Sequence, residues 1–455
     1  MDEEHRHVAL LLTRVADDAG PFEAPPLTSL PGRRRRSVGP VLAGGATAAT
    51  VLALAVALST TGAQHDPTTR RDTASPREFR PAPPTPDVPV SALKTYRWSA
   101  LPTAPIVARS NASSAWTGHD LIVWGGQTSR GLRDDGAVYD PVSRTWTVLP
   151  AAPLTPRAGA LSAWVAGRFV VWGGGALGGG KQASDGASYD PTTRAWATLP
   201  AAPVSSYGWA QLVVVGDRAV LLSTPRYGQQ IVHVDAYDPA TGMWRTLPDL
   251  TAPADHQISS VAVLVAGDTV YVWLDWYRDV PSPANSVTIY SGVDSYSLDT
   301  STGRWATASL KPGHGYSDNP IWTGRQILLV DEYSACGPCD SPLSLGPPSE
   351  AIDPQTGRRT SIPTGPLSLE SLGYFWTGSA LLSLGVAPQG GTQNHRTYRG
   401  NTAVWDPGTN RWARVASATL SGDPAGAVRA WTGTELLVWG VAGPSAGLQF
   451  APVGS

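Results

Sequence analysis

The sequence predicts an all-β protein: a seven-bladed β-propeller closed by its N-terminal strand and preceded by a single transmembrane helix. Three observations support this prediction. A unit of about 50 residues recurs through most of the chain, and short apolar runs within each unit are separated by turn residues. An uncharged segment near the N-terminus is long enough to cross a bilayer.

The composition agrees with a turn-rich β-protein. The 455 residues include 48 Gly, 41 Pro and 18 Trp, and only 15 % are charged, against about 25 % in ordinary soluble domains. The net charge of −2 argues against a nucleic-acid partner, because nucleic-acid binding needs a basic surface. Two cysteines are too few for a disulfide scaffold.

Residues 1–37 are predicted to be a cytoplasmic tail that contains a short helix. Apolar side chains recur there at spacings of three and four residues, as on one face of a helix: Val8, Leu11, Leu12 and Val15. This helix is either a plain juxtamembrane helix or a docking site for a cytoplasmic regulator.

Residues 38–62 are predicted to be the transmembrane helix. The uncharged core, residues 41–58, spans roughly 27 Å at 1.5 Å per residue, and four arginines, Arg33 to Arg36, precede it. Because basic residues stay on the cytoplasmic side, we expect a single-pass protein of the cell membrane with its N-terminus inside and its propeller outside. The alternative is a cleaved signal peptide ending near Ala63. Residues 63–92 are predicted to be a Pro-rich, semi-rigid linker, and residues 93–455 the propeller.

Each repeat is predicted to be a four-stranded antiparallel sheet. Residues 158–200 contain an apolar strand, a tight turn, a second apolar strand, a variable loop, a strand ending in Tyr-Asp-Pro and a strand opening with Trp. One such sheet cannot bury both of its faces, whereas sheets repeated around an axis can.

The turn before the Trp strand recurs six times, with Asp at its first position. The Asp carboxylate caps the turn, Pro sets φ at the second position in five of the six turns, and Gly or Asn at the fifth, where present, tolerates a left-handed backbone. We therefore assign these aspartates a structural role: Asp140, Asp190, Asp238, Asp299, Asp353 and Asp406.

The repeat resembles the kelch repeat of β-propeller proteins, within the superfamily of the galactose oxidase central domain. The marks of the resemblance are the Gly doublets at 125–126 and 173–174, the Tyr-Asp-Pro strands, and a Trp about seven residues later. It covers roughly residues 93 to 455 and is clearest in the first two units. The resemblance implies a propeller fold. The copper-containing domain of galactose oxidase has the same kind of fold, so this chain is similar to it at the fold level. The two His, two Tyr and crosslinked Cys of that copper site are not found here, so no cofactor or metal site is predicted.

The two ends of the repeat region complement each other. The first unit begins with a Trp strand, residues 95–102, and the last unit stops before its own Trp strand. We therefore expect the N-terminal strand to pair with the C-terminal sheet, which removes the last exposed edge.

Strand parity places the long, variable connections on one end of the propeller and the short uniform turns on the other. The predicted variable loops are residues 125–135, 173–185, 223–231, 274–290, 331–348, 385–400 and 440–446. Because variable loops on a rigid scaffold commonly carry function, we expect a ligand to bind on the loop side. Aromatic rings beside carboxylates and Arg suit a glycan or a peptide. The candidate binding residues are Tyr207, His256, Asp275, Trp276, Tyr277, Arg278, His314, Tyr316, Asp331, Glu332 and Tyr333.

Cys336 and Cys339 lie in a loop rich in Gly, Pro and Ser. Their spacing is that of thioredoxin-like redox motifs, but such motifs place the first thiolate at a helix N-terminus. Outside the membrane, a disulfide that staples the loop is the expected state, with redox activity or metal binding as alternatives.

The function predicted from these features is that of a membrane-anchored binding module, whose loop side meets a glycan or a protein of the cell envelope. A single propeller does not need to oligomerise, so a monomer is expected. Two alternatives remain at this level. One is a carbohydrate-active enzyme, either a metal-free isomerase or hydrolase that uses loop carboxylates or, less favoured, an enzyme like galactose oxidase. The other is a transmembrane sensor coupled to a cytoplasmic regulator.

Overall fold

The computed structural model describes residues 87–453, with gaps. The gaps are residues 177–181, 205–206, 226–229, 282–286, 309, 311–319, 331–348, 367–370, 393–394, 422–423, 425 and 441–446. The chain divides into two compact units, Met1–Asp72 and Thr73–Ser455, and the described residues all belong to the second.

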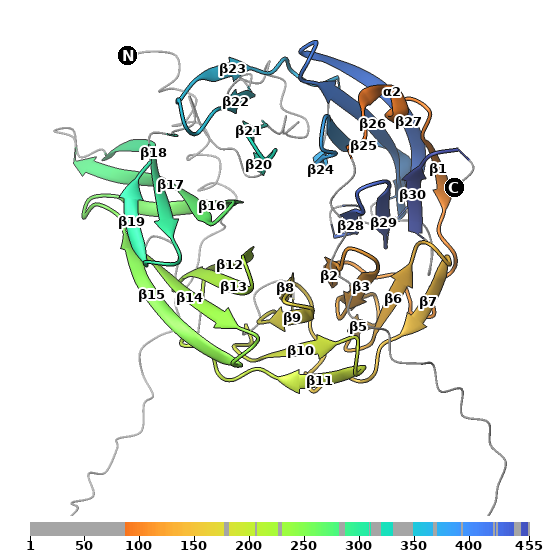
Figure 1. The fold of residues 1–455 in the computed structure, drawn as a ribbon, viewed down its shortest axis with the longest axis horizontal. Coiled ribbons are helices and arrows are strands. Elements are labelled where there is room, and N and C mark those ends of the chain that lie inside the picture. The colour runs from red at the N-terminus through yellow and green to blue at the C-terminus, as the bar shows by residue number, and fades with distance from the viewer. Residues whose placement is uncertain are drawn as a thin grey trace, which may run out of the picture. The chain divides into compact units, whose positions relative to one another are not determined.

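The described residues form seven four-stranded antiparallel sheets arranged around a central axis (Figure 1). We number these blades in chain order. Blade 1 contains β2 (Ser113–Trp116), β3 (Leu121–Trp124), β6 (Gly136–Asp140) and β7 (Thr145–Val148). Its β3–β6 loop carries the small hairpin β4 (Gln127–Thr128) and β5 (Gly131–Leu132). Blade 2 contains β8 (Leu161–Val165), β9 (Arg168–Trp172), β10 (Gly186–Asp190) and β11 (Ala195–Thr198).

Blades 3 to 6 follow the same order. Blade 3 contains β12 (Trp209–Val215), β13 (Arg218–Thr224), β14 (Ile231–Asp238) and β15 (Met243–Thr251). Blade 4 contains β16 (Gln257–Ala266), β17 (Thr269–Pro281), β18 (Val287–Asp299) and β19 (Arg304–Thr307). Blade 5 contains β20 (Ile321–Trp322), β21 (Ile327–Leu329), β22 (Glu350–Ile352) and β23 (Arg359–Ser361). Blade 6 contains β24 (Ser371–Trp376), β25 (Leu381–Thr392), β26 (His395–Asp406) and β27 (Arg411–Ser421).

Blade 7 joins the two ends of the propeller, as the sequence predicts. It contains β28 (Val428–Trp431), β29 (Leu436–Trp439), β30 (Gly447–Ala451) and, as its outer strand, β1 (Arg97–Ala100). Trp98 lies opposite Phe450 in the β1–β30 pair, and both aromatic rings pack together with Tyr96. The seven-bladed, N-terminally closed propeller is therefore confirmed.

The apolar core is divided among the boundaries between blades. The described residues form seven buried apolar clusters, and each combines side chains from two neighbouring blades. This arrangement follows from the sequence pattern, because alternate residues of a strand face opposite sides of its sheet. Each blade thus buries both faces against its neighbours.

The last residues of the predicted linker, residues 63–92, already pack onto the propeller, beginning at Val88. Val88 exchanges two hydrogen bonds with Thr377: its N–H donates to the Thr377 carbonyl at 3.0 Å, and its carbonyl accepts from the Thr377 hydroxyl at 2.9 Å. The short helix α2 (Val90–Leu93) follows, with Leu93 fully buried between blades 6 and 7. Residues 88–96 therefore strengthen the closure made by β1.

The Asp turns are built as their sequence predicts. In all six, the Asp Oδ1 accepts a hydrogen bond from the backbone N–H two residues later, at 2.8–2.9 Å. The fifth residue of each turn has φ between 52° and 70°, including Arg144 and Arg194, where the sequence has neither Gly nor Asn. The turn geometry is therefore common to all six blades, and it imposes a left-handed backbone on these two arginines.

One of these turns leads to a prediction about acid stability. The hydroxyl of Ser301, the side chain and N–H of Thr302 and the N–H of Ser301 interact with the Asp299 carboxylate and lower its pKa to about 2. A carboxyl whose pKa falls on folding stabilises the protein above its unfolded pKa of about 3.9 and loses that contribution as the pH falls toward 2. We expect Asp299→Ala to lower the free energy of unfolding at pH 6 and to have less effect at pH 2.5. Urea unfolding at both pH values measures this, and an equal difference at both would contradict it.

The Gly doublets mark close backbone approaches. All four residues, Gly125, Gly126, Gly173 and Gly174, have positive φ. A Cβ on Gly174 would lie 2.7 Å from the backbone of Ala160. Any larger residue at Gly174 would have a strained backbone and would also push against Ala160, which directly precedes β8.

Two connections expected to be variable loops are regular hairpins instead. Residues 274–290 and 385–400 largely belong to the long strand pairs β17–β18 and β25–β26. Residues 274–290 continue the β-branched and aromatic residues of the strand they follow, which favours strand extension, whereas residues 385–400 contain four Gly and one Pro and give no such signal. Blades 4 and 6 therefore carry longer second and third strands than blades 1 and 2.

Among the described residues, no helix has the length and apolar character needed to span a bilayer. The predicted membrane segment, residues 41–58, and the predicted cytoplasmic helix lie outside the described residues.

Candidate functional site

Two faces of the propeller differ in what they carry. The short-turn face holds the turns between the first and second strands and the Asp turns. The loop face holds the connections between the second and third strands and those between blades. All the predicted binding residues that the structure describes belong to loop-face segments: Tyr207, His256, Asp275, Trp276, Tyr277 and Arg278.

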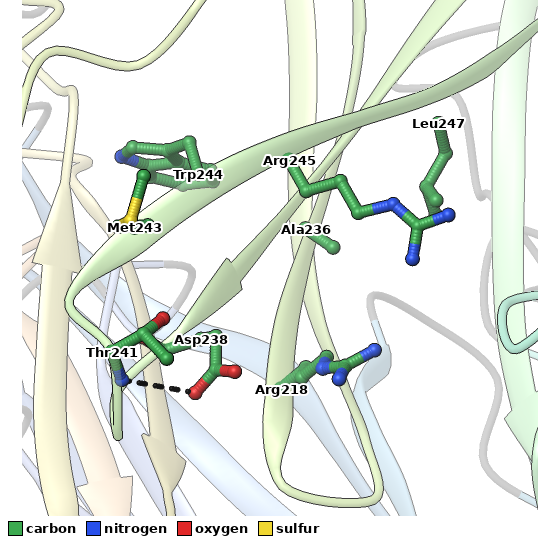
Figure 2. Close-up of a pocket in the computed structure, with 8 residues that line it drawn as sticks. All are labelled: Arg218, Ala236, Asp238, Thr241, Met243, Trp244, Arg245 and Leu247. Carbon is green, nitrogen blue, oxygen red and sulfur yellow. Dashed lines mark hydrogen bonds between the residues drawn. The ribbon is translucent and has the colours of Figure 1, made fainter.

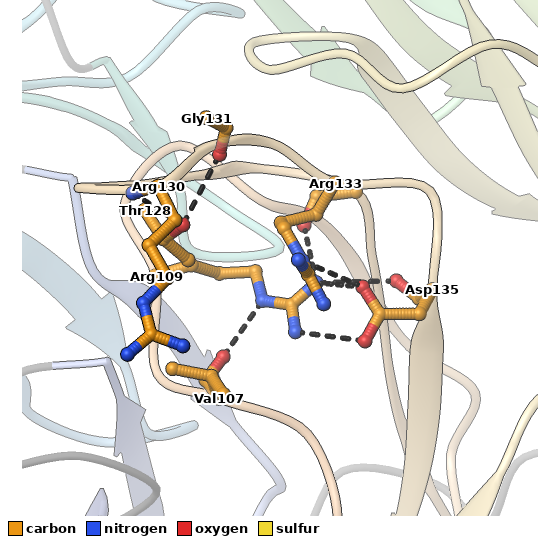
Figure 3. A network of polar contacts seen from close by, with 8 residues as sticks. Val107, Arg109, Thr128, Arg130, Gly131, Arg133 and Asp135 are labelled. Carbon is orange, nitrogen blue, oxygen red and sulfur yellow. Dashed lines mark hydrogen bonds and ion pairs between the residues drawn. The ribbon is translucent and has the colours of Figure 1, made fainter.

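An ion pair between a buried arginine and a partly exposed aspartate links two segments of the loop face in blade 1 (Figure 3). Arg109 lies just before the first strand, and its side chain is fully buried. Its Nη1 and Nη2 donate to the two carboxylate oxygens of Asp135 at 2.5 and 3.1 Å, and Nη1 also reaches the carbonyl of Gly125 at 3.3 Å. The guanidinium thereby joins the connection between blades to the β3–β6 loop.

The same ion pair recurs in blade 2. Arg157 donates to both carboxylate oxygens of Asp185, at 2.6 and 3.2 Å, and to the carbonyl of Gly173 at 3.2 Å. The hydrogen bond from Arg157 holds the pKa of Asp185 below its ordinary value. Burial alone would raise the pKa of Asp135, but Arg109 and Arg133 outweigh burial and lower it. These pairs are structural, because arginines at matching places in two repeats hold equivalent carboxylates in the same way.

Blade 4 has a histidine where blades 1 and 2 have this arginine. The strand register shows which residues are equivalent: Tyr139, Tyr189 and Leu298 each lie on the third strand of their blade, opposite the start of the second strand. An aspartate stands four residues before each of them: Asp135, Asp185 and Asp294. His256, just before the first strand of blade 4, contacts Asp294 with Nδ1 at 2.8 Å from Oδ2. Both side chains are mostly buried. His256–Asp294 is thus the blade-4 version of the repeated pair.

An aromatic ring supports His256. The imidazole stacks on the indole of Trp276 with ring centroids 3.5 Å apart and planes 11° apart. Gly292, on the neighbouring strand, leaves room for this indole, because a Cβ there would lie 2.6 Å from the ring. Trp276 therefore acts mainly as a support inside the protein, and its ring is not a fully open platform for a sugar.

The exposed rim of the cluster is charged. Arg278 Nη1 contacts Asp255 Oδ2 at 2.7 Å, and the guanidinium lies 6.0 Å from the centroid of the Trp276 ring. The other Asp255 oxygen lies 3.8 Å from Nε2 of His256. The hydrogen bond from Arg278 lowers the pKa of Asp255, so this carboxylate is charged at neutral pH. We call Asp255, His256, Trp276, Arg278 and Asp294 the blade-4 cluster.

The structure thus brings His256, Trp276 and Arg278 together, as residues of one cluster. Asp275 is buried on the same strand and accepts a hydrogen bond from the hydroxyl of Ser260 at 2.5 Å. Tyr277 is half-buried on β17, where it pairs with Gln257.

Tyr207 lies elsewhere on the loop face, at the boundary of blades 2 and 3. Its hydroxyl accepts a hydrogen bond from the N–H of Gly174 at 3.0 Å, and its ring packs 5.1 Å from that of Trp172. These contacts hold the second Gly doublet in place. The remaining candidates lie outside the described residues: His314, Tyr316, Asp331, Glu332, Tyr333, Cys336 and Cys339.

The predicted set does not include Asp294, whose carboxylate holds His256. A signal was present in the sequence, because Asp135 and Asp185 occupy the same place in their repeats. In blade 4 the Tyr of this pattern is replaced by Leu298, so the equivalence of Asp294 is not obvious in the sequence. The strand register of the structure shows it.

Metal chemistry has no support in the described part of the chain, where no group of three or more His, Cys, Asp or Glu residues is placed to hold an ion. The blade-4 cluster offers charged hydrogen-bonding groups on a rigid base. Such a surface is suited to recognition.

Comparison with known proteins agrees with the repeat. Residues 78–273 match the family model of the KLHDC2/KLHL20/DRC7 Kelch-repeats domain. No curated protein matches this chain. A solved structure titled "Structure of YjhT" is 17 % identical, covers 76 % of this chain and 95 % of its own, and has a TM-score of 0.39. The chain thus carries a kelch-repeat domain and folds as a seven-bladed β-propeller.

Proposed function

We propose that this chain is a membrane-anchored, extracytoplasmic interaction module that binds a protein of the cell envelope through its loop face. The observation that carries the proposal is the blade-4 cluster, whose exposed rim pairs Asp255 with Arg278 over buried supports. Kelch propellers commonly serve as protein-interaction modules, and function in such folds lies in the loops.

The chemistry of the rim favours a protein over a glycan. A sugar-binding platform needs an open aromatic face, but His256 already stacks on Trp276. The groups left accessible are a carboxylate and a guanidinium, 56 % and 41 % exposed at their side chains. Charged rim groups steer encounter and select partners more than they add affinity. A glycan remains the second outcome that the experiment below can detect.

Photocrosslinking on intact cells tests the loop face directly. A photoreactive residue at Tyr277 reports on the blade-4 cluster, and one at Val142, which is 93 % exposed on an Asp turn, reports on the short-turn face as a matched control. We expect Tyr277 to give a discrete crosslinked species that Arg278→Ala weakens, and Val142 to give none. Identical products at both sites would argue against the proposal, and a thermal shift with cell-wall glycan fragments would favour the glycan.

Membrane anchoring is tested separately. Because residues 41–58 form the predicted anchor, we expect the full chain to remain in the membrane after alkaline carbonate extraction and a chain lacking residues 41–58 to be released. Release of the full chain would favour the cleaved signal peptide and leave the loop-face proposal to be judged by crosslinking alone.

A further inference from the structure

Blade 3 contains a pocket that the proposed function does not use. Its volume is ≈ 230 Å³, and it is bounded by β13, β14, β15 and the Asp turn of the short-turn face (Figure 2). The lining residues are Arg218, Ala236, Asp238, Thr241, Met243, Trp244, Arg245 and Leu247. Two of its eight side chains are arginines.

The repeat provides an internal standard for Arg245. This residue pairs with Ala236 across the third and fourth strands, one place after the Trp. The equivalent place in each of the other six blades holds a small residue: Ser99, Thr147, Ala197, Ala306, Thr360 or Ala413. The propeller scaffold therefore does not require an arginine here, and Arg245 is peculiar to blade 3.

The second arginine differs from its counterpart in its ion pair. Arg168 and Arg218 both open the second strand of their blade, opposite Val165 and Val215. In blade 2, Arg168 Nη1 lies 2.6 Å from Asp190 Oδ2. In blade 3, Asp238 caps its turn as Asp190 does, but the ion-pair contact of Arg218 is with the exposed Asp217, at 4.0 Å.

The two guanidinium groups thus share one pocket. Figure 2 shows both arginine side chains pointing to the right of the view, Arg245 above Arg218, with Asp238 and Thr241 to the left of Arg218. Among the described residues, Arg245 has no ion-pair partner. Two guanidiniums around one space present several N–H donors to a single anion, and phosphate or sulfate oxygens match this geometry.

We propose that this pocket binds a small phosphate or sulfate monoester, with Arg218 and Arg245 on the oxyanion. The pocket is larger than a bare oxyanion, so it has room for a small organic group. Asp238 and Thr241 also line the pocket, and their side-chain oxygens can form hydrogen bonds with hydroxyl groups of the organic part of the ligand. The site belongs to the short-turn end of blade 3 and does not depend on the loop-face partner.

Calorimetry and thermal unfolding of the full chain in detergent test the pocket. The probes are inorganic phosphate, inorganic sulfate and glucose 6-phosphate, with glucose and sodium chloride at matched ionic strength as controls. A ligand that binds only the folded state raises the Tm in a saturable way. We expect such a rise with glucose 6-phosphate and with at least one inorganic oxyanion, and none with glucose or chloride.

Two variants make the test specific. Arg245→Ala introduces the residue that blade 2 has at this place, so the fold should tolerate it, and we expect the Kd for glucose 6-phosphate to rise roughly ten-fold or more. Arg168→Ala is the control: it removes the blade-2 arginine that corresponds to Arg218, outside the pocket, and it should leave the Kd unchanged. The proposal is overturned if no probe gives a saturable response, or if both variants bind alike.

Discussion

Asp135→Ala is expected to lower the free energy of unfolding by about 3 kcal/mol, because it leaves a buried guanidinium without its counter-ion. The Arg109 side chain is fully buried, and two of its strongest hydrogen bonds go to the Asp135 carboxylate. Its remaining bonds go to neutral carbonyl groups of Val107, Gly125 and Asp135, which cannot balance the charge. Urea unfolding followed by Trp fluorescence measures the loss.

A double variant distinguishes two contributions to the free energy of unfolding: the penalty for an unpaired buried charge and the stabilisation from the ion pair itself. In Arg109→Met with Asp135→Ala, no buried charge remains, and we expect much of the lost stability to return. Asp134→Ala, at the neighbouring position, is the matched control and should change stability by less than about 0.5 kcal/mol. If the double variant is less stable than Asp135→Ala alone, then the pair does more than neutralise a charge.

Phe450→Ala is expected to cost about 4 kcal/mol, because it opens a cavity where the propeller closes. Phe450 is fully buried, and its ring lies 5.3 Å from those of both Tyr96 and Trp98. The substitution removes the aromatic contacts between β30 and the residues in and before β1, so it also weakens the pairing that hides the final sheet edge.

The control for this prediction is Val453→Ala, two residues beyond the same strand. Val453 is 72 % exposed, so its substitution should change the free energy of unfolding by less than about 0.5 kcal/mol. The Phe450 variant should also expose β1 to proteolysis. Equal stability of the two variants would mean that closure of blade 7 contributes little.

Much of the architecture is readable from the sequence because turn chemistry is local. The Asp at the start of each Asp turn hydrogen-bonds a residue two places away, so a six-residue window identifies the turn. The spacing of these turns indicates the number of blades, and the incomplete first and last units indicate the closure. The lengths of β17–β18 and β25–β26 were misjudged, because a strand that extends beyond the repeat pattern resembles a loop insertion in the sequence.

The candidate site was only partly predictable. His256, Trp276 and Arg278 were selected for their chemistry and position, and they do lie together. Their roles came from contacts across the blade: Asp294 is 38 residues from His256, and the face of Trp276 that could have held a ligand is covered by His256. Neither fact follows from neighbouring residues.

By itself, the sequence determined the repeat, its turns and the way the propeller closes, since each depends on residues that are near one another in the chain or on complementary ends. Tertiary structure alone decided which charges meet. Arg109 and Asp135 come from different connections, and Arg218 and Arg245 come from different strands of one blade. Strand register sets these distances, and a shift of one residue would turn each side chain to the other face of its sheet.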